Sequence, residues 1–263
     1  MLPVALTIAG SDSGGGAGIQ ADLKTFHQLG VYGASALTLI TVQNTVRVSR
    51  VEILEPELVS EQIRAVLEDL PPGAAKTGAM GSSGIIEAVS GALAGAAFPV
   101  VVDPVLISTH GEALLDSNGL AAFRDLLLPR ASLVTPNLHE AAELTGLPVD
   151  SPEEMRAAAA RIAGFGPRAV LIKGGHLTGP AVDVLYFDGA LREFESPRCD
   201  TVHTHGTGCT YSSAITAYLA RGLGLTDAVR AAKGFITEAI RTSPGVGSGS
   251  GPVNHWAVAP DSL

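Results

Sequence analysis

The sequence has little cysteine, which excludes a disulfide-stabilised scaffold and a cysteine-rich zinc protein. Only Cys199 and Cys209 occur among the 263 residues. Two cysteines cannot form a disulfide framework, and their spacing does not match a cysteine-rich zinc site. Long hydrophobic runs are also lacking: the most apolar stretch, 84–107, is interrupted by charged residues and prolines, so no membrane span is predicted. The first residues lack the basic region of a secretory signal, and we expect a cytoplasmic protein.

Positive charge is scarce as well. The chain has 17 lysine and arginine residues against 26 acidic residues, a formal net charge of −9. A protein of this charge is not expected to bind nucleic acid. The glycine-rich stretch 10–18 matches neither the dinucleotide-binding fingerprint nor a P-loop, and no P-loop occurs elsewhere. A local helix dipole could still bind an anionic substrate.

Apolar runs of strand length alternate with amphipathic runs of helix length. Strands are predicted at 4–9, 74–77, 100–103, 132–134 and 169–173, with helices between them. This alternation predicts an α/β fold with a mainly parallel central sheet and helices on both faces. The strand-like runs 34–42 and 46–54 have no helix between them, which predicts a small strand flap at one edge. No linker or repeat divides the chain, so we expect a single domain over residues 1–263.

A glycine turn opens one of the last predicted helices. Residues 204–210, Thr-His-Gly-Thr-Gly-Cys-Thr, lead directly into a helix-patterned run at 210–222. The backbone N–H groups and the dipole at such a helix start can bind an anion. The pKa of a thiol tends to fall there, and we expect this for Cys209. Gly206, Thr207, Gly208 and Cys209 are therefore candidate catalytic residues for phosphoryl transfer, with a plain glycine turn as the alternative.

Polar side chains follow several predicted strands at their carboxyl ends, where ligands of open α/β sheets bind. They are Asp103, Asn137, Glu140 and Lys173. Two acids, an amide and a lysine could together hold magnesium and a polyphosphate. Each also has a structural alternative. Asn137 and Glu140 fit a helix cap with its capping-box partner, Asp103 could cap a strand end, and Lys173 could be a solvated strand end.

The chain also carries a series of short motifs in order. They are Leu6–Asp12, Ser13–Gly16, Ala17–Phe26, Gln43–Thr45, Val102–Val105, Thr135–Ala141, Lys173–His176, Thr204–Thr210 and Gly251–His255. Together they resemble the hydroxymethylpyrimidine and phosphomethylpyrimidine kinases of thiamine biosynthesis, members of the ribokinase-like superfamily. The resemblance runs nearly from end to end, and so many ordered motifs make chance similarity implausible.

The resemblance implies a homodimeric, ATP- and magnesium-dependent kinase. Its substrate would be 4-amino-5-hydroxymethyl-2-methylpyrimidine, phosphorylated to the monophosphate and then to the pyrophosphate. The pyrimidine is expected at Gln43, Asp22, Gly10, Ala17, Val42, Met80 and Val105, ATP at Asn137, Lys173, Thr204 and Gly206, and magnesium at Glu140 and Asp103. The chain departs from the family at Ser108–Gly111, where a lysine is often found, so a role for His110 stays open. Met80 is also shifted by one place.

Two residues allow a chemical argument beside the resemblance. A glutamine amide matches the amino group and ring nitrogen of an aminopyrimidine, so Gln43 fits that ring, although it could also merely end a strand. The resemblance places Cys209 where many ribokinase relatives have an aspartate base. A thiolate could accept the proton of the alcohol, whereas the second acceptor, a phosphate, needs no base. The alternatives are a pyridoxal or pyridoxine kinase, which Gln43 disfavours, and a non-catalytic pyrimidine-binding domain.

Overall fold

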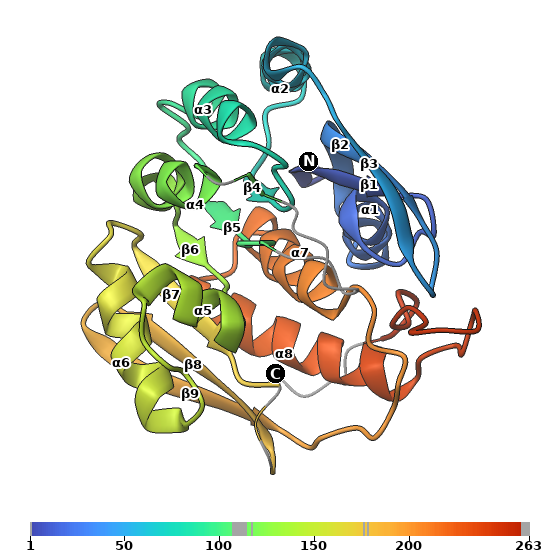
Figure 1. Ribbon diagram of the computed structural model, residues 1–263, viewed down its shortest axis with the longest axis vertical. Helices are drawn as coiled ribbons and strands as arrows, with labels where there is room; N and C mark the ends of the chain where they lie inside the picture. Colours follow the sequence, from blue (N-terminus) through green and yellow to red (C-terminus); the bar gives the residue numbers. More distant parts are fainter. Residues whose placement is uncertain (1, 107–114, 117, 176, 178, 259–263) are drawn as a thin grey trace.

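One nine-stranded sheet, with the order β3-β2-β1-β4-β5-β6-β7-β8-β9, lies at the centre of the molecule (Figure 1). The computed structural model describes residues 2–106, 115–116, 118–175, 177 and 179–258. The strands are β1 (Val4–Asp12), β2 (Tyr32–Gln43), β3 (Val48–Ile53), β4 (Ala74–Thr77), β5 (Val100–Val102), β6 (Leu133–Val134), β7 (Ala169–Lys173), β8 (Ala181–Phe187) and β9 (Ala190–Ser196). The helices are α1 (Gly18–Gln28), α2 (Pro56–Asp69), α3 (Ser83–Ala92), α4 (Gly119–Ala122), α5 (Leu138–Thr145), α6 (Pro152–Ala163), α7 (Thr207–Ala220) and α8 (Leu225–Arg241).

The sheet is parallel in its middle and antiparallel at both edges. Strands β2, β1, β4, β5, β6 and β7 run parallel to one another. At one edge β3 pairs antiparallel with β2, which confirms the predicted flap. At the other edge β8 and β9 form a hairpin. Its turn residues Asp188 and Gly189 have φ angles of 51° and 72°, the positive values that a tight two-residue hairpin turn requires.

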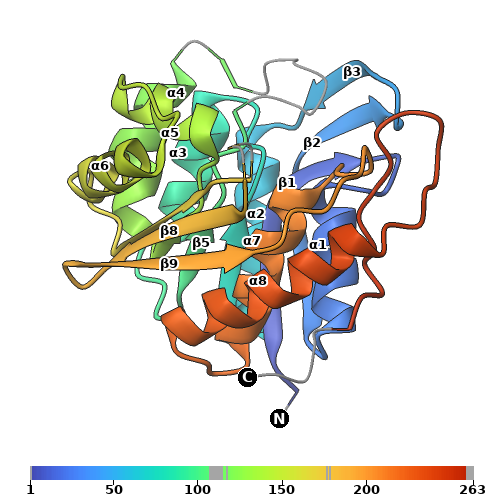
Figure 2. The same cartoon turned by 90° about the horizontal axis from the view of Figure 1, so that it is seen from below.

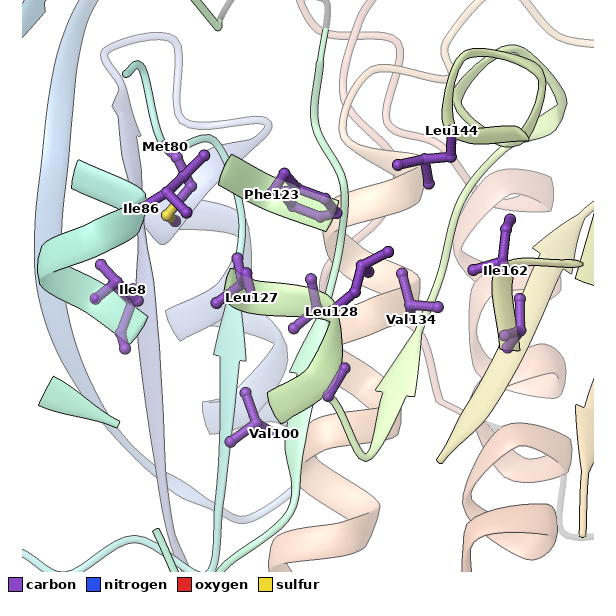
Figure 3. Close-up of a cluster of buried hydrophobic side chains, with 14 of the residues drawn as sticks. Ile8, Met80, Ile86, Val100, Phe123, Leu127, Leu128, Val134, Leu144 and Ile162 are labelled. Carbon is purple, nitrogen blue, oxygen red and sulfur yellow. The ribbon is translucent and has the colours of Figure 1, made fainter. Parts of the chain in front are cut away.

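Alternate residues of the inner strands face opposite sides of the sheet, and each side has its own helices. Val100 and Val102 pack with α2, α3, α5 and α6 in the cluster of Figure 3. Val101 packs on the other side with α7 and α8, where Phe26 of α1 also meets α7. The predicted cover of helices on both faces is therefore confirmed. In the described part of the chain, no helix is long and apolar enough to span a bilayer.

Early and late segments of the chain meet at the carboxyl edge of the parallel strands. Figure 2 shows the C-terminal segment, in red, passing beside the end of β2. There the Gly249 N–H donates to Thr45 Oγ1 at 3.3 Å. His205, just before α7, forms a short parallel bridge with Pro252. The edge where ligands are expected is thus built from early and late parts of the sequence.

Candidate active site

A cavity of about 680 Å³ lies at this carboxyl edge. The ends of β1, β2 and β7, the residues that follow β5, and the first turn of α7 line it. The expected site residues that line it are Gly10, Ala17, Gln43, Asp103, Val105, Asn137, Glu140, Lys173, Thr204, Gly206, Thr207, Gly208 and Cys209. The fold therefore brings the candidate pyrimidine, phosphate and metal residues into one space.

Three expected pyrimidine contacts, Asp22, Val42 and Met80, do not belong to the cavity lining. Val42 is 54% exposed on the outer face of the flap, because neighbouring residues of a strand point to opposite sides and Gln43 takes the inner one. Met80 is buried in the hydrophobic core (Figure 3), and Ala79 lines the cavity in its place. Contact of these three residues with the ring therefore stays a prediction that the cavity lining does not support.

Asp22 instead forms a closed ion pair with Lys76 beneath the first turn of α7. Its two carboxylate oxygens accept hydrogen bonds from Lys76 Nζ at 2.8 and 2.9 Å. The hydroxyls of Thr7 and Ser213 donate to the same carboxylate, each at 2.6 Å. Neither the Asp22 nor the Lys76 side chain is exposed. Burial alone would lower the pKa of Lys76, but the Asp22 charge raises it above its ordinary value, so the ammonium group stays charged.

A second ion pair, Asp103 with Lys173, borders the cavity. Lys173 Nζ donates to Asp103 Oδ1 at 2.9 Å, and the hydroxyls of Thr135 and Ser212 donate to the same carboxylate at 3.1 and 3.0 Å. Burial alone would raise the pKa of Asp103, but Lys173 lowers it below its usual range. Burial alone would lower the pKa of Lys173, but Asp103 raises it. This pair thus adds one fixed positive and one fixed negative charge to the cavity wall.

Asn137 and Glu140 form the predicted capping box at the start of α5. The Glu140 N–H donates to Asn137 Oδ1 at 2.9 Å, and the Asn137 N–H donates to Glu140 Oε2 at 2.7 Å. Burial raises the pKa of Glu140 to about 7, against the opposing effect of Lys173 and with a further rise from Asp103. The cap therefore does not exclude a functional role, because it also fixes a carboxyl group of raised pKa at the cavity wall.

The glycine turn before α7 is shaped by two close approaches. Gly206 has a φ of 77°, and a Cβ added there would lie 1.8 Å from the Gly16 carbonyl oxygen, so only glycine fits. A Cβ at Gly208 would lie 3.3 Å from Lys173 Nζ. The Thr207 hydroxyl donates to the Thr204 carbonyl at 2.7 Å. The first turn of α7, at the positive end of the helix dipole, therefore lies beside a lysine, which suits an anion.

The pKa of Cys209 is shifted opposite to the expected direction. Burial raises the pKa of the thiol to about 11. Lys76 opposes this rise, whereas Asp22 and Asp103 add to it. The expected lowering is therefore wrong, because desolvation and two nearby acids raise the pKa by more than Lys76 and the Gly18 N–H lower it. At neutral pH Cys209 is a thiol and not a thiolate.

A polar cluster around Asp12 was not predicted from the sequence. This carboxylate accepts hydrogen bonds from the N–H groups of Gly14, Gly16 and Ala17 at 2.7–3.0 Å. Its Oδ2 also lies 2.9 Å from His205 Nε2. Burial alone would raise the pKa of Asp12, but His205 and the backbone donors lower it. A signal was present, because Asp12 follows its strand as Asp103 does and His205 stands inside the glycine-turn motif.

Asp103 and Glu140 form a carboxylate pair that could hold a metal ion. Among the described residues, no group of three or more His, Cys, Asp or Glu side chains could hold one. Magnesium needs only one or two carboxylates when it also binds substrate phosphates and water. The donor set therefore fits magnesium carried in with a nucleotide. His110, with the segment 108–111, and His176 lie outside the described residues.

Known proteins resemble this chain over nearly its full length. A family model described as phosphomethylpyrimidine kinase matches residues 12–254. A Streptomyces coelicolor protein named hydroxymethylpyrimidine/phosphomethylpyrimidine kinase is 51% identical over 257 residues, covering 97% of this chain and 96% of its own.

Two solved structures show the same ribokinase-like α/β fold. The ADP complex of Bacillus subtilis pyridoxal kinase is 39% identical, with a TM-score of 0.90 over 98% of both chains. The phosphomethylpyrimidine kinase of Clostridium difficile 630 is 45% identical, with a TM-score of 0.81 over 90% of this chain and 99% of its own. The family model and these relatives show that the chain, with its cavity and glycine turn, belongs to the phosphomethylpyrimidine kinase family.

Proposed function

We propose that this enzyme transfers the γ-phosphoryl group of ATP to the hydroxymethyl oxygen of 4-amino-5-hydroxymethyl-2-methylpyrimidine, and then to the resulting monophosphate. One observation carries the proposal: the anion-binding turn connects the two functional ends of a single cavity. Gln43 Nε2 lies 3.4 Å from His205, which directly precedes the turn. Gly208, within the turn, passes beside Lys173. A ring held at Gln43 and a phosphate held at Lys173 would therefore meet at the turn.

The pyrimidine is proposed to bind through Gln43. Its amide can pair with the amino group and the adjacent ring nitrogen of the substrate, as glutamine pairs with adenine. Gly10, Ala17 and Val105 also line the cavity, and their small or apolar side chains leave space for a flat ring. The family relationship supports this placement, and the position of Gln43 at the cavity end of β2 supports it independently.

The phosphates are proposed to lie against the first turn of α7 and Lys173, with Asn137 and Thr204 completing the ATP site. Phosphoryl transfer needs little covalent chemistry from a protein and depends on positioning and charge. The Asp103–Lys173 ion pair keeps Lys173 protonated and holds it at 2.9 Å from the carboxylate. Its ammonium group can therefore offset the charge on the transferred group without being free to move away.

Asp103 and Glu140 are proposed to hold magnesium. When bound between these carboxylates and a nucleotide, the ion would offset part of the negative charge of the phosphates. The raised pKa of Glu140 suits this role, because a carboxyl group that is costly to ionise in an empty site gains most from a bound cation. Cys209 is proposed to orient the acceptor hydroxyl as a neutral thiol. A loose transition state does not require a strong base.

Phosphorus NMR of the purified protein with Mg-ATP and the aminopyrimidine alcohol tests the proposal. The expected result is the monophosphate, followed by the pyrophosphate. A Lys173→Met variant, measured in parallel, should give neither product at a comparable rate. Binding of the pyrimidine without turnover would instead indicate a non-catalytic binding domain.

A second activity is suggested by the likeness to Bacillus subtilis pyridoxal kinase. A matched sample with pyridoxine tests it. The pyrimidine could give only the monophosphate while pyridoxine is turned over faster. That result would identify the protein as a pyridoxine kinase of vitamin B6 metabolism. It would also make Gln43 a strand-end residue without a role in recognition.

The proposed homodimer has support at the flap. Ile40, Val42 and Ile53 of β2 and β3 are each at least 44% exposed, and a second copy of the chain could cover them. Light scattering after size-exclusion chromatography should give twice the chain mass, and Val42→Glu should lower it. The expected cytoplasmic location stays a prediction, which cell fractionation can test.

A further inference from the structure

The Gln43 amide is held between two partners that are themselves almost buried. Its Oε1 lies 3.1 Å from Thr41 Oγ1, and its Nε2 lies 3.4 Å from His205 Nε2. Thr41 is 7% exposed and His205 is 3% exposed. An amide can turn by 180° about its last bond and exchange its two ends with almost no change of shape. The hydrogen-bonding capacity of the two partners therefore decides which end faces which.

The first partner, His205, must present a hydrogen at Nε2. This nitrogen lies 2.9 Å from Asp12 Oδ2. Asp12 is ionised and already accepts three backbone N–H groups of the glycine-rich loop, so it cannot donate a proton. An amide NH₂ placed against the same Nε2–H would set two donors against each other. An amide oxygen could share that hydrogen with Asp12.

The second partner, Thr41, has already used its proton. Its Oγ1 donates to the Ser11 carbonyl oxygen at 2.9 Å. A hydroxyl has one proton, so any further neighbour at 3.1 Å must donate to Thr41 instead of accepting from it. The amide NH₂ can do this and the amide oxygen cannot. Both partners thus require the same orientation of the amide.

We infer that His205 and Thr41 lock the Gln43 amide with its oxygen toward His205 and its NH₂ toward Thr41, and so fix the direction in which an aminopyrimidine binds. This inference rests on the proposed role of Gln43 in the function above. His205 and Thr41 are positioning residues, since they act through the Gln43 side chain.

The locked amide presents an acceptor on the His205 side and a donor on the Thr41 side. In the substrate, the 4-amino group lies between a ring nitrogen and the carbon that carries the hydroxymethyl group. Pairing the amino group with the amide oxygen therefore directs the hydroxymethyl group to the His205 side. The turn Gly206–Cys209 follows His205 directly. The opposite amide orientation would bind the ring turned over, with the hydroxyl away from the turn.

Amide orientation can be read without any activity measurement. In the protein with selectively ¹⁵N-labelled glutamine side chains, we expect nuclear Overhauser contacts from the Gln43 NH₂ protons to the Thr41 methyl group. A Gln43→Leu variant identifies the signal by its loss. Contacts from the NH₂ protons to the His205 ring in place of the Thr41 methyl would overturn the inference. This reading holds even if the aminopyrimidine is not the substrate, so it separates failure of the inference from failure of the proposed function.

A kinetic test uses Thr41, because changes at His205 would also disturb the adjoining turn. Thr41→Val removes the hydroxyl and keeps the shape, and should raise KM for the aminopyrimidine roughly tenfold, the effect of one hydrogen bond. KM for ATP should stay unchanged. The inhibition constant of 5-hydroxymethyl-2-methylpyrimidine, which lacks the amino group, should change much less. Thr41→Ser keeps the hydroxyl and should restore the original KM. Equal weakening for both ligands, or no rescue by serine, would make Thr41 a packing residue and overturn the inference.

Discussion

Two lysine–aspartate pairs lie beneath and beside the first turn of α7, and they differ in what can reach them. In the inner pair, Lys76 with Asp22, the shortest distance is 2.8 Å and neither side chain is exposed. In the cavity pair, Lys173 with Asp103, the distance is 2.9 Å and 13% of the Lys173 side chain is exposed. The two pairs have the same residue types and nearly the same distance. Residue type and distance therefore do not show which pair supports the fold and which could bind substrate.

Exposure makes the difference, because both lysines border the cavity but only Lys173 of the two has an exposed side chain. The inner carboxylate has all its partners inside the protein, including Ser213 of α7. The carboxylate of the cavity pair, Asp103, accepts a hydrogen bond from the neighbouring hydroxyl of Ser212. Its lysine, however, is partly exposed to space that a phosphate could occupy. The same type of ion pair can therefore support the fold where both side chains are buried, and can form part of a binding site where its lysine is partly exposed.

The largest effect should follow from breaking the inner pair. Lys76→Met leaves an unpaired carboxylate in the core, which should lower the free energy of unfolding by about 3–5 kcal/mol. Urea denaturation measures this loss. The paired change Asp22→Leu with Lys76→Met removes both charges and should recover most of it. A loss as large in the double variant as in the single one would show that packing, and not the unpaired charge, dominates.

Breaking the cavity pair should affect the reaction more than the fold. Lys173→Met should lower kcat by about 100-fold or more, because a charge that stabilises the transferred group is gone. The accompanying loss of unfolding free energy should be less than half that of Lys76→Met. Steady-state kinetics and urea denaturation of the same preparation test both statements. A fully active variant would remove Lys173 from the site.

Glu140, beside the cavity pair, should make stability depend on pH. Its folded-state pKa of about 7 lies above the ordinary value of 4.5, so the folded state holds a proton that the unfolded state loses between these pH values. The free energy of unfolding should therefore fall as pH rises through this window. Glu140→Gln keeps the cap but has no ionisable group at this position, so it lacks this pH dependence. The variant should gain about 1–3 kcal/mol relative to the unaltered protein between pH 5 and pH 8. A constant difference from pH 5 to 8 would contradict the raised pKa.

The smallest effect is expected at Cys209, which lies between the two pairs. Cys209→Ala should slow phosphorylation of the alcohol by about tenfold, because one weak hydrogen bond to the acceptor is lost. Phosphorylation of the monophosphate should slow less. Separate assays of the two steps decide this, with Cys209→Ser as the matched variant that keeps a hydrogen-bonding group. Equal losses in both steps would make Cys209 a packing residue.

Patterns carried by neighbouring residues predicted much of the molecule. The strand flap, the glycine turn and the capping box of Asn137 and Glu140 each depend on a few consecutive positions, and each was found where expected. The placement of Lys173 beside Asp103 followed from a general rule about strand ends, since both end parallel strands of one sheet.

Features that depend on burial and distant partners could not be predicted in the same way. The pKa of Cys209 was predicted from the helix start alone, but burial raises it, with a further rise from two nearby acids. Asp22 was expected at the ring, yet its partner Lys76 lies 54 residues away in the sequence and draws it into the core. The contact between Asp12 and His205 spans 193 residues, and although each residue lies beside a recognisable motif, no local pattern pairs the two.

That last contact also sets when the site can exist during synthesis of the protein. A ribosome adding about 5–20 residues per second needs roughly 10–40 s to proceed from Asp12 to His205. During that interval the first strand and its glycine-rich loop are already made, but the turn that will bind phosphate is not. The emerging chain therefore cannot bind its substrates in the final geometry, and neither substrate can assist folding until synthesis is almost complete.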